Sequence, residues 1–249
     1  MTVPPDIPPT LIGVAVLLVV TCAVLWVFRV PKAWAPATAI LRGVVQLAVI
    51  SVILTGVIRS PVWIAVALTV MFSVAVSVAT GRIGWSLRAL TMMGTSIVAG
   101  VLVAATIVFA TGALAFTPRY ALAIGAIIIG NAMTIATLTG RMFTSAVNDH
   151  WDEVEGWLAL GARPRESTVQ LARQAVRNAL IPSIDQTRTT GLVVLPGAFV
   201  GAIFGGISPL EAGRFQIVVL ASIMAAGALT AVLVASWMGP VRTKPVPLT

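Results

Sequence analysis

Charged residues are scarce in this chain. Among its 249 residues only 10% are Asp, Glu, Lys or Arg, while 58% are hydrophobic. Soluble globular domains carry about 25% charged residues, and no water-soluble fold could bury so much apolar surface. The composition therefore excludes a soluble protein and favours one that is embedded in a membrane.

Groups that perform chemistry are equally rare. Cys22 is the only cysteine, which excludes an intramolecular disulfide and a thiolate metal cluster, and His150 is the only histidine. The sequence has no G-x-x-x-x-G-K-S/T phosphate-binding loop and no arrangement suited to nucleophilic catalysis. We expect a protein that is not an enzyme and binds no cofactor itself. We interpret Cys22 as a buried structural thiol and His150 as part of a solvated acidic helix face rather than a metal site.

Long apolar stretches dominate what is present. A bilayer core about 30 Å thick takes roughly 20 helical residues to cross, and these stretches are too long and too uniformly apolar for barrel strands. The sequence therefore predicts an all-α fold, a polytopic transmembrane helical bundle that forms a single domain over residues 1–249. Seven stretches qualify: 11–28, 37–58, 62–80, 90–111, 120–140, 189–207 and 215–238.

The basic residues predict an orientation. With seven spans and the N-terminus outside, every Lys and Arg except Arg59, Arg119 and Arg214 falls on the inner side or its border. Basic residues are retained on the cytoplasmic side, so we expect a multi-pass protein of the cytoplasmic (inner) membrane with its C-terminus inside. The same residues account for the net charge of +8 through anionic lipid, and no nucleic acid partner is needed.

One connection between the spans is long, and residues 144–186 form its central, cytoplasmic segment. Apolar residues from Phe143 to Leu158 recur at helical spacing, with acidic residues opposite. Gly161 is typical of a helix stop, and Pro164 of the start of a second amphipathic helix. Two interpretations remain open. The two helices form a surface that a soluble partner binds, or they lie in the lipid headgroup layer and make the protein more rigid there.

Polar and small residues inside the spans are candidates for function. Asn131 and Thr134 share a helix face. They either form a polar stripe that faces the substrate or make hydrogen bonds to a neighbouring helix. Pro196 would free the carbonyl of Leu192, either as a cation ligand or satisfied by a neighbour. The glycines at 197, 201 and 205 permit close helix packing in the bundle or a dimer. Before them, Ser183 and Gln186 fit a capping box, and Asp185 could pair with Arg188.

Five short blocks follow one another in the second half of the chain. They are Gly130-Asn131-Ala132-Met133-Thr134; Leu158-Ala159-Leu160-Gly161-Ala162-Arg163-Pro164-Arg165; Ala179-Leu180-Ile181-Pro182-Ser183-Ile184-Asp185; Gly191-Leu192-Val193 with Leu195-Pro196-Gly197; and Gly205-Gly206 with Ser208-Pro209-Leu210-Glu211-Ala212. In this order they resemble the core of Fet-type ABC transporter permeases, a family linked to iron export. The first four spans match that family only in hydropathy and number.

The resemblance implies a permease that pairs with itself and with two copies of a separate ATP-binding subunit, which holds ATP and Mg. Its cargo would be iron or another metal, exported from the cytoplasm. The metal-contacting residues are unknown. We expect the fifth and sixth spans to line the substrate path, with Asn131, Thr134, Leu192, Pro196 and Gly197 as the candidate residues. The ridge of Gly197, Gly201 and Gly205 would pack helices.

A cytoplasmic helix of ABC permeases generally fits a cleft in the ATPase, and Glu155 with Gly161 resembles the EAA-type coupling motif. Gly156 and Trp157 stand where that motif has two alanines, and Ile181-Pro182 is displaced. The predicted coupling residues are Trp151, Glu155, Leu158, Gly161, Ala162, Arg163 and Pro164.

Two other functions remain open at this point. A stand-alone secondary carrier or channel would transport without ATP or a partner, whereas a scaffold that anchors a soluble enzyme would bind without flux. The sequence contains no convincing internal repeat of the kind that marks many secondary carriers, which weakly favours a subunit that becomes symmetric by dimerising.

Overall fold

The computed structural model describes residues 7–57 and 60–246, and within them it is almost entirely α-helical, with no strand. The chain divides into two compact units, Met1–Arg59 and Ser60–Thr249. The expected all-α fold is confirmed. Each unit is described by itself below.

The first unit is a pair of helices, α1 (Ile7–Val27) and α2 (Ala35–Val57). The turn between them has left-handed backbone at Arg29 and Lys32, with φ values of 56° and 59°. Most of the apolar side chains of α1 are exposed, Leu17 by 69% for example, as suits a helix that contacts lipid. Cys22 is buried and free, which confirms the interpretation of a buried thiol.

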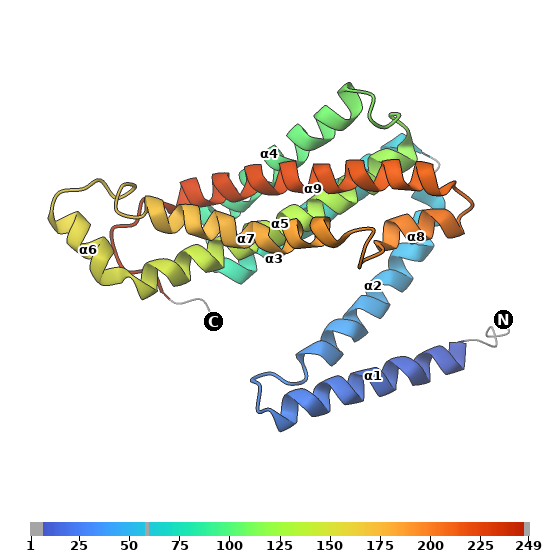
Figure 1. Ribbon diagram of the computed structural model, residues 1–249, viewed down its shortest axis with the longest axis horizontal. Coiled ribbons are helices and arrows are strands. Elements are labelled where there is room, and N and C mark those ends of the chain that lie inside the picture. Colours follow the sequence, from blue (N-terminus) through green and yellow to red (C-terminus); the bar gives the residue numbers. More distant parts are fainter. Residues whose placement is uncertain (1–6, 58–59, 247–249) are drawn as a thin grey trace. The chain divides into compact units, whose positions relative to one another are not determined.

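The second unit holds the remaining helices and is built around two long ones (Figure 1). Helix α5 packs against α3, α4, α7 and α9, and α9 packs against α4, α5, α7 and α8. These helices are α3 (Pro61–Ile83), α4 (Leu87–Ala110), α5 (Pro118–Asp149), α6 (Trp151–Ala159), α7 (Val169–Thr189), α8 (Gly197–Phe204) and α9 (Pro209–Met238).

Local sequence signals set where the long helices begin. The side chains of Ser86, Thr117 and Ser208 each accept a hydrogen bond from the backbone N–H three residues later, at the starts of α4, α5 and α9. Such caps satisfy N–H groups that have no partner within the helix. Prolines occupy the first position of α3, α5 and α9, where their missing N–H costs nothing.

The core of this unit depends on small residues. At Gly100 on α4, a Cβ atom would lie 2.6 Å from the carbonyl oxygen of Ala226 on α9 and against the hydroxyl of Thr230. The Thr230 hydroxyl donates a hydrogen bond of 3.3 Å to the Ser96 carbonyl. The two helix backbones therefore approach as closely as small-residue membrane interfaces allow.

Five helices of the described chain are long and apolar enough to cross a membrane: α1 over Pro9–Val27, α3, α4, α5 and α9. The apolar part of α2, Ala35–Ser51, is shorter. The protein is thus a polytopic helical membrane protein. The predicted sixth span, 189–207, is wrong as a continuous helix, because α7 ends at Thr189 and α8 begins at Gly197. Gly191, with φ at +85°, and Pro196 lie between them.

The long connection also differs from the expectation. Residues 169–189 form α7, which packs along α5 and α9 instead of projecting from the bundle. The predicted capping box of Ser183 and Gln186 is wrong, because α7 continues through Pro182 to Thr189. The expected pair of Asp185 and Arg188 is present, with 3.9 Å between carboxylate and guanidinium atoms.

Gly100→Ala should destabilise the protein, because the added methyl group collides with backbone. We expect the free energy of unfolding to fall by about 1–3 kcal/mol, the usual cost of overpacking, measured by thermal unfolding in detergent. Gly94→Ala is the control, since its Cβ would meet only Val76, at an ordinary 3.7 Å. Equal stabilities of the two variants would contradict the close approach of α4 and α9.

Candidate functional site

Helix α7 is far more polar than the other long helices of its unit, and its polar residues gather on one side. Its buried side consists of Ala175 and Ala179. We define the polar face of α7 as its exposed residues Gln170, Gln174, Arg177, Asp185 and Arg188. At 3.6 residues per turn these positions lie on one side of α7, where the exposed Ile181 separates Arg177 from Asp185.

Two contacts with α9 fix the position of α7 along the length of α9. The hydroxyl of Thr168, just before α7, donates a hydrogen bond of 2.6 Å to the carbonyl of Gly239, just after α9. Twelve residues further along α7, Leu180 lies 3.6 Å from the position of a Cβ atom at Gly227, twelve residues earlier in α9. The two helices are therefore antiparallel neighbours in register.

Helix α8 continues the same path, because Phe199 lies against Gly213 near the start of α9. Thus α7 and α8 together run beside α9, which is long and apolar enough to span the membrane, with an interruption between Thr189 and Gly197. Figure 1 shows α7 and α8 following one another along α9.

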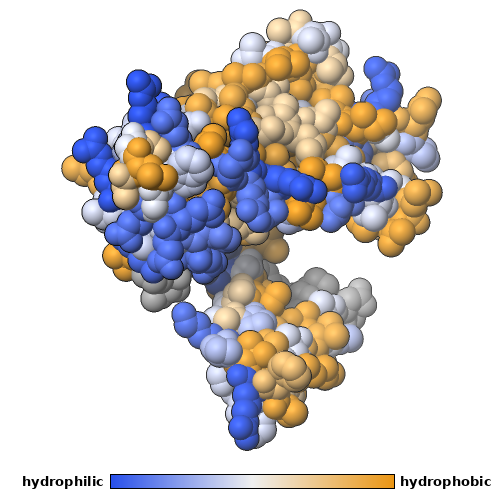
Figure 2. All heavy atoms as spheres, turned by 60° about the vertical axis from the view of Figure 1, so that its left-hand side comes forward, coloured by the Kyte–Doolittle hydropathy of each residue, from blue (hydrophilic) through white to orange (hydrophobic). Residues whose placement is uncertain are grey.

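This register places charged side chains beside α9, which is long and apolar enough to cross a membrane. Arg177 is nine residues beyond Thr168, or about 13 Å at 1.5 Å per residue. Ionisable groups inside a bilayer face a bundle interior or water, since exposure to hydrocarbon is costly. Figure 2 shows hydrophilic residues gathered at the end that carries α6 and continuing across the visible face beside apolar surface. The polar face of α7 therefore requires water or protein beside it.

Helix α5, which packs against α7, adds a second exposed stripe. Gly130, Thr134, Arg141 and Ser145 are exposed on one side of α5, and Asn131 is half-buried. The Asn131 amide donates to the carbonyl of Ile127 at 2.9 Å, and the Thr134 hydroxyl to that of Gly130 at 3.1 Å. Both bonds lie within α5 and join no other helix. A role of Asn131 and Thr134 in the path stays a prediction.

The segment between α7 and α8 exposes the predicted residues around Pro196. Leu192 is 90% exposed, and the Gly191 N–H donates to the Val194 carbonyl at 2.9 Å in a tight turn. Pro196 is the N-cap of α8, so the expectation that it interrupts a helix from within is wrong: the helix has already ended. Irregular backbone occurs inside a bilayer only where protein or water lies beside it. This segment therefore has the same requirement as the polar face of α7.

The glycine ridge has no partner within the described chain. A Cβ atom at Gly197 or Gly201 would meet nothing within 4 Å, and one at Gly205 only carbonyls of its own helix. Close approach to other helices occurs instead at Gly100 and Gly140. Packing of the ridge against a second copy stays a prediction.

The predicted apolar stripe after residue 142 is confirmed, but it spans two helices. Phe143, Val147 and Val154 are buried. Helix α5 continues to Asp149, and the backbone of His150 then leaves the helical region (φ −115°, ψ 31°), so that α6 begins at Trp151.

The end of α6 follows the sequence signals in part. Gly161 has φ at +88°, and the N–H groups of Gly161 and Ala162 donate to the carbonyls of Leu158 and Trp157 at 3.0 Å, which is the expected glycine stop. Pro164 was expected at a helix start, and this is wrong, because α7 begins at Val169. A hydrogen bond of 2.9 Å from the Arg163 N–H to the Glu166 carboxylate orders the intervening turn.

Exposure separates the predicted coupling residues into two groups. Glu155, Gly161 and Arg163 are exposed, whereas the others are at least partly covered: Trp151, Leu158, Ala162 and Pro164 are half-buried.

Sequence reasoning missed two neighbours of this set. Trp157 is 52% and Leu160 83% exposed, and their separation of three residues places them on one side of the α6 end. Both lie outside the apolar stripe that faces the bundle. An apolar residue outside that stripe is the sequence signal that could have identified them.

Metal-ligating groups do not cluster in the part of the chain that the structure describes. No group of three or more His, Cys, Asp or Glu side chains is present there. The Nδ1 atom of His150 lies 3.0 Å from the carbonyl oxygen of Ala146, so this imidazole caps the end of α5.

A further cavity of the second unit lies away from this polar surface. It has a volume of about 920 Å³ and opens between α3, α4 and α5, with walls that are almost wholly apolar, including Leu68, Phe72 and Phe109. Such walls suit hydrocarbon better than a polar cargo. The polar face of α7, the α5 stripe and the α6 end therefore remain the candidate functional site.

Thr168→Val should loosen the start of α7, because it leaves the Gly239 carbonyl buried without its 2.6 Å donor. We expect a loss of about 1–3 kcal/mol in unfolding free energy, measured by thermal unfolding. Thr187→Val is the matched control, since the exposed Thr187 hydroxyl donates only within α7, to Ser183. If the control were equally destabilised, the Thr168 bond would not be what anchors α7.

Comparison with known proteins agrees with this architecture. No solved structure matches the chain. The chain is 37% identical to "UPF0014 membrane protein STAR2" of rice (Oryza sativa subsp. japonica), over 78% of this chain and 69% of that protein. It is 35% identical to "Protein ALUMINUM SENSITIVE 3" of Arabidopsis thaliana, over 77% and 71% of the two chains.

The expected likeness to Fet-type permeases is supported only in part. The chain is 34% identical to "Probable iron export permease protein FetB" of Escherichia coli, over 47% of this chain and 45% of that protein. The wider relationship is established by a family model, described as "Uncharacterised protein family (UPF0014)", that matches residues 9–240. The chain therefore belongs to the UPF0014 family of membrane proteins.

Proposed function

We propose that this chain is the membrane-spanning permease subunit of an ABC transporter, which works as a homodimer with a separate ATP-binding subunit. One observation carries the proposal: the polar face of α7 lies beside apolar spans and is uncovered in a single copy. The permease name of FetB, a relative of this chain, supports the same assignment.

A symmetric pair of copies would resolve the conflict between this face and lipid. In a twofold dimer the same surface patch of each copy meets its counterpart. The polar face of α7 and the neighbouring α5 stripe would then line a path between the copies, screened from hydrocarbon. Asn131 and Thr134 would contribute polar groups to its wall, and the segment with Leu192 and Pro196 would lie toward its outer end.

The α6 end supplies a surface for the ATP-binding subunit. Trp157 and Leu160 present exposed apolar groups at the end of α6, Glu155 is exposed on the same helix, and Gly161 ends the helix sharply. Apolar groups rimmed by charge are typical of protein interfaces. Behind them, Val154 is buried and Trp151 packs on the cluster around Phe143. A displacement of α6 would therefore reach α5 directly.

We extend the proposal to the cargo, as export of iron or another metal from the cytoplasm. The printed name of FetB concerns iron export and supports this assignment by similarity alone. The orientation that we propose, with the N-terminus outside, puts α6 on the cytoplasmic side, where ATP is available.

A secondary carrier is the second candidate, and one feature favours it. The crossing made by α7 and α8 is interrupted at residues 190–196, and interrupted helices form the substrate sites of many secondary carriers. Such a carrier would move its cargo without ATP.

The experiment is transport by proteoliposomes that contain this chain with its co-expressed ATP-binding subunit. We expect ATP-dependent iron movement across the bilayer and none with this chain alone. Trp157→Ala combined with Leu160→Ser should abolish most of the ATP-dependent transport and of the partner's retention in purification. ATP-independent transport by the chain alone would support the carrier instead.

The matched control is Trp63→Ala combined with Leu210→Ser. These residues are 57% and 80% exposed and lie near the starts of α3 and α9, at the other end of the bundle from α6. The control should keep both transport and partner. Equal loss of transport and of partner retention in the two double variants would contradict the docking role of α6. ATP-dependent transport of another cargo but not of iron would contradict only the assignment of the cargo.

A further inference from the structure

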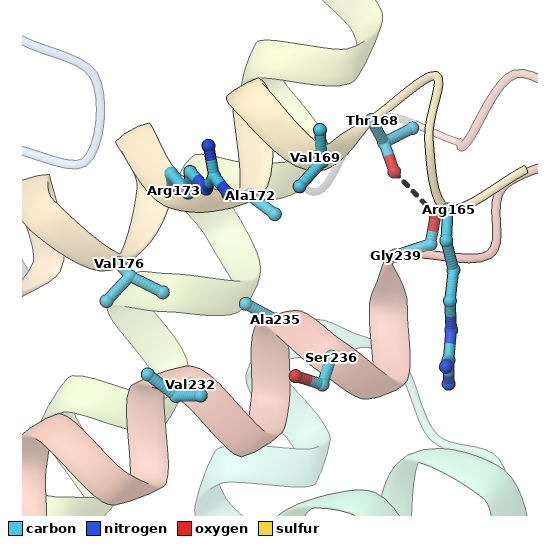
Figure 3. A pocket seen from close by; sticks show the side chains of 10 residues that line it. All are labelled: Arg165, Thr168, Val169, Ala172, Arg173, Val176, Val232, Ala235, Ser236 and Gly239. Carbon is cyan, nitrogen blue, oxygen red and sulfur yellow. Dashed lines mark hydrogen bonds between the residues drawn. The ribbon is translucent and has the colours of Figure 1, made fainter.

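A groove lies between the start of α7 and the end of α9 (Figure 3). Its volume is about 350 Å³, at the lower end of small-molecule sites. The α7 wall carries Val169, Ala172 and Val176, and the α9 wall carries Val232 and Ala235. The floor of the groove is thus largely apolar over about two turns of α7 and one turn of α9, with Ser236 as its polar member on α9.

Two arginines border this apolar floor. Arg165 precedes α7, and its side chain extends past the end of α9, with Cγ 3.9 Å from the position of a Cβ atom at Gly239 (Figure 3). Arg173 is exposed on the α7 wall, offset from the polar face of that helix toward α9. No acidic side chain is among the residues that line the groove, so the positive charge there is uncompensated.

The groove lies at the basic border of the bundle. Met238, at the end of α9, and Ile83, at the end of α3, both lie against Gly140. Arg82 directly precedes Ile83 in the sequence, and Arg141 directly follows Gly140. This end carries the basic residues that mark the cytoplasmic side. In the orientation proposed above this end faces the cytoplasm, so Arg165 lies toward the inner headgroups. The floor of the groove, with Arg173 on its α7 wall, extends from there toward the acyl chains.

We propose that this groove binds an anionic phospholipid of the inner leaflet. Arg165 beside the end of α9 and Arg173 on the α7 wall each supply positive charge to the anionic headgroup, and the upper part of an acyl chain lies between Val176 and Val232. Basic pockets between helices on the cytoplasmic side bind acidic headgroups for this reason. A free phosphate would leave the apolar floor bare, and a neutral lipid would leave the two guanidinium groups unpaired.

The position of the lipid suggests what it does. Arg165 belongs to the turn that links α6 to α7, and Thr168 three residues later anchors that turn to Gly239. A lipid held by Arg165 and resting on α9 would tie the same two elements together a second time. It would stabilise the junction between the α6 end and the bundle, without any dependence on the transported cargo.

The test is thermal unfolding of the full chain in nanodiscs, made either of phosphatidylcholine alone or with added phosphatidylglycerol. The unvaried chain should unfold at a higher temperature with phosphatidylglycerol. Arg165→Gln combined with Arg173→Gln should remove this shift. Native mass spectrometry should show phosphatidylglycerol retained by the unvaried chain and lost from the double variant.

The control is Arg82→Gln combined with Arg242→Gln, which removes the same charge outside the groove and should keep the shift. A further variant, Val232→Trp, fills the apolar floor and should reduce lipid retention while both arginines remain. The proposal is overturned if the control loses the shift equally, if the groove variants retain it, or if inorganic phosphate alone reproduces it in phosphatidylcholine discs.

Discussion

The packing of α7 against α9 is the constraint on which the rest of this structure depends. The bond from Thr168 to the Gly239 carbonyl and the contact of Leu180 with Gly227 hold the two helices in antiparallel register. Since α9 is long and apolar enough to span a membrane, this register sets Arg177 and Asp185 beside a candidate span. The cost of charge in hydrocarbon then demands water or a second copy beside α7, and the permease hypothesis follows from that demand.

Much of the fold could be predicted from the sequence, because its strongest signals are local. Uniformly apolar stretches of about 20 residues identify spans whatever their neighbours, and Pro118 or Ser208 set helix starts through groups on their own helix. The glycine stop at Gly161 and the apolar side of Phe143 and Val154 were predictable for the same reason. Each of these signals acts within a single helix, so it can be recognised without knowing which helices lie beside it.

The position of α7 could not be predicted, because it depends on contacts distant in sequence. The residues of α7 read as a cytoplasmic amphipathic helix, and only the small residues Ala175, Ala179 and Gly227 show that α7 fits closely beside α5 and α9. The interruption after Thr189 was hidden by apolar residues on both sides of it. At the candidate site, Asn131 and Glu155 stood out by residue type, whereas Trp157 and Leu160 could be recognised only by their position outside the apolar stripe that faces the bundle.

The central claim is that the polar face of α7 contacts water at membrane depth. It is tested most directly with single cysteines placed in a Cys22→Ser background and treated with a charged, membrane-impermeant thiol reagent in proteoliposomes. Thiols react as thiolates, which form in water. Arg177→Cys should be modified, whereas Val103→Cys, exposed on the apolar helix α4, should be protected. Protection of both positions would contradict the account, because the polar face of α7 would then have no aqueous path beside it.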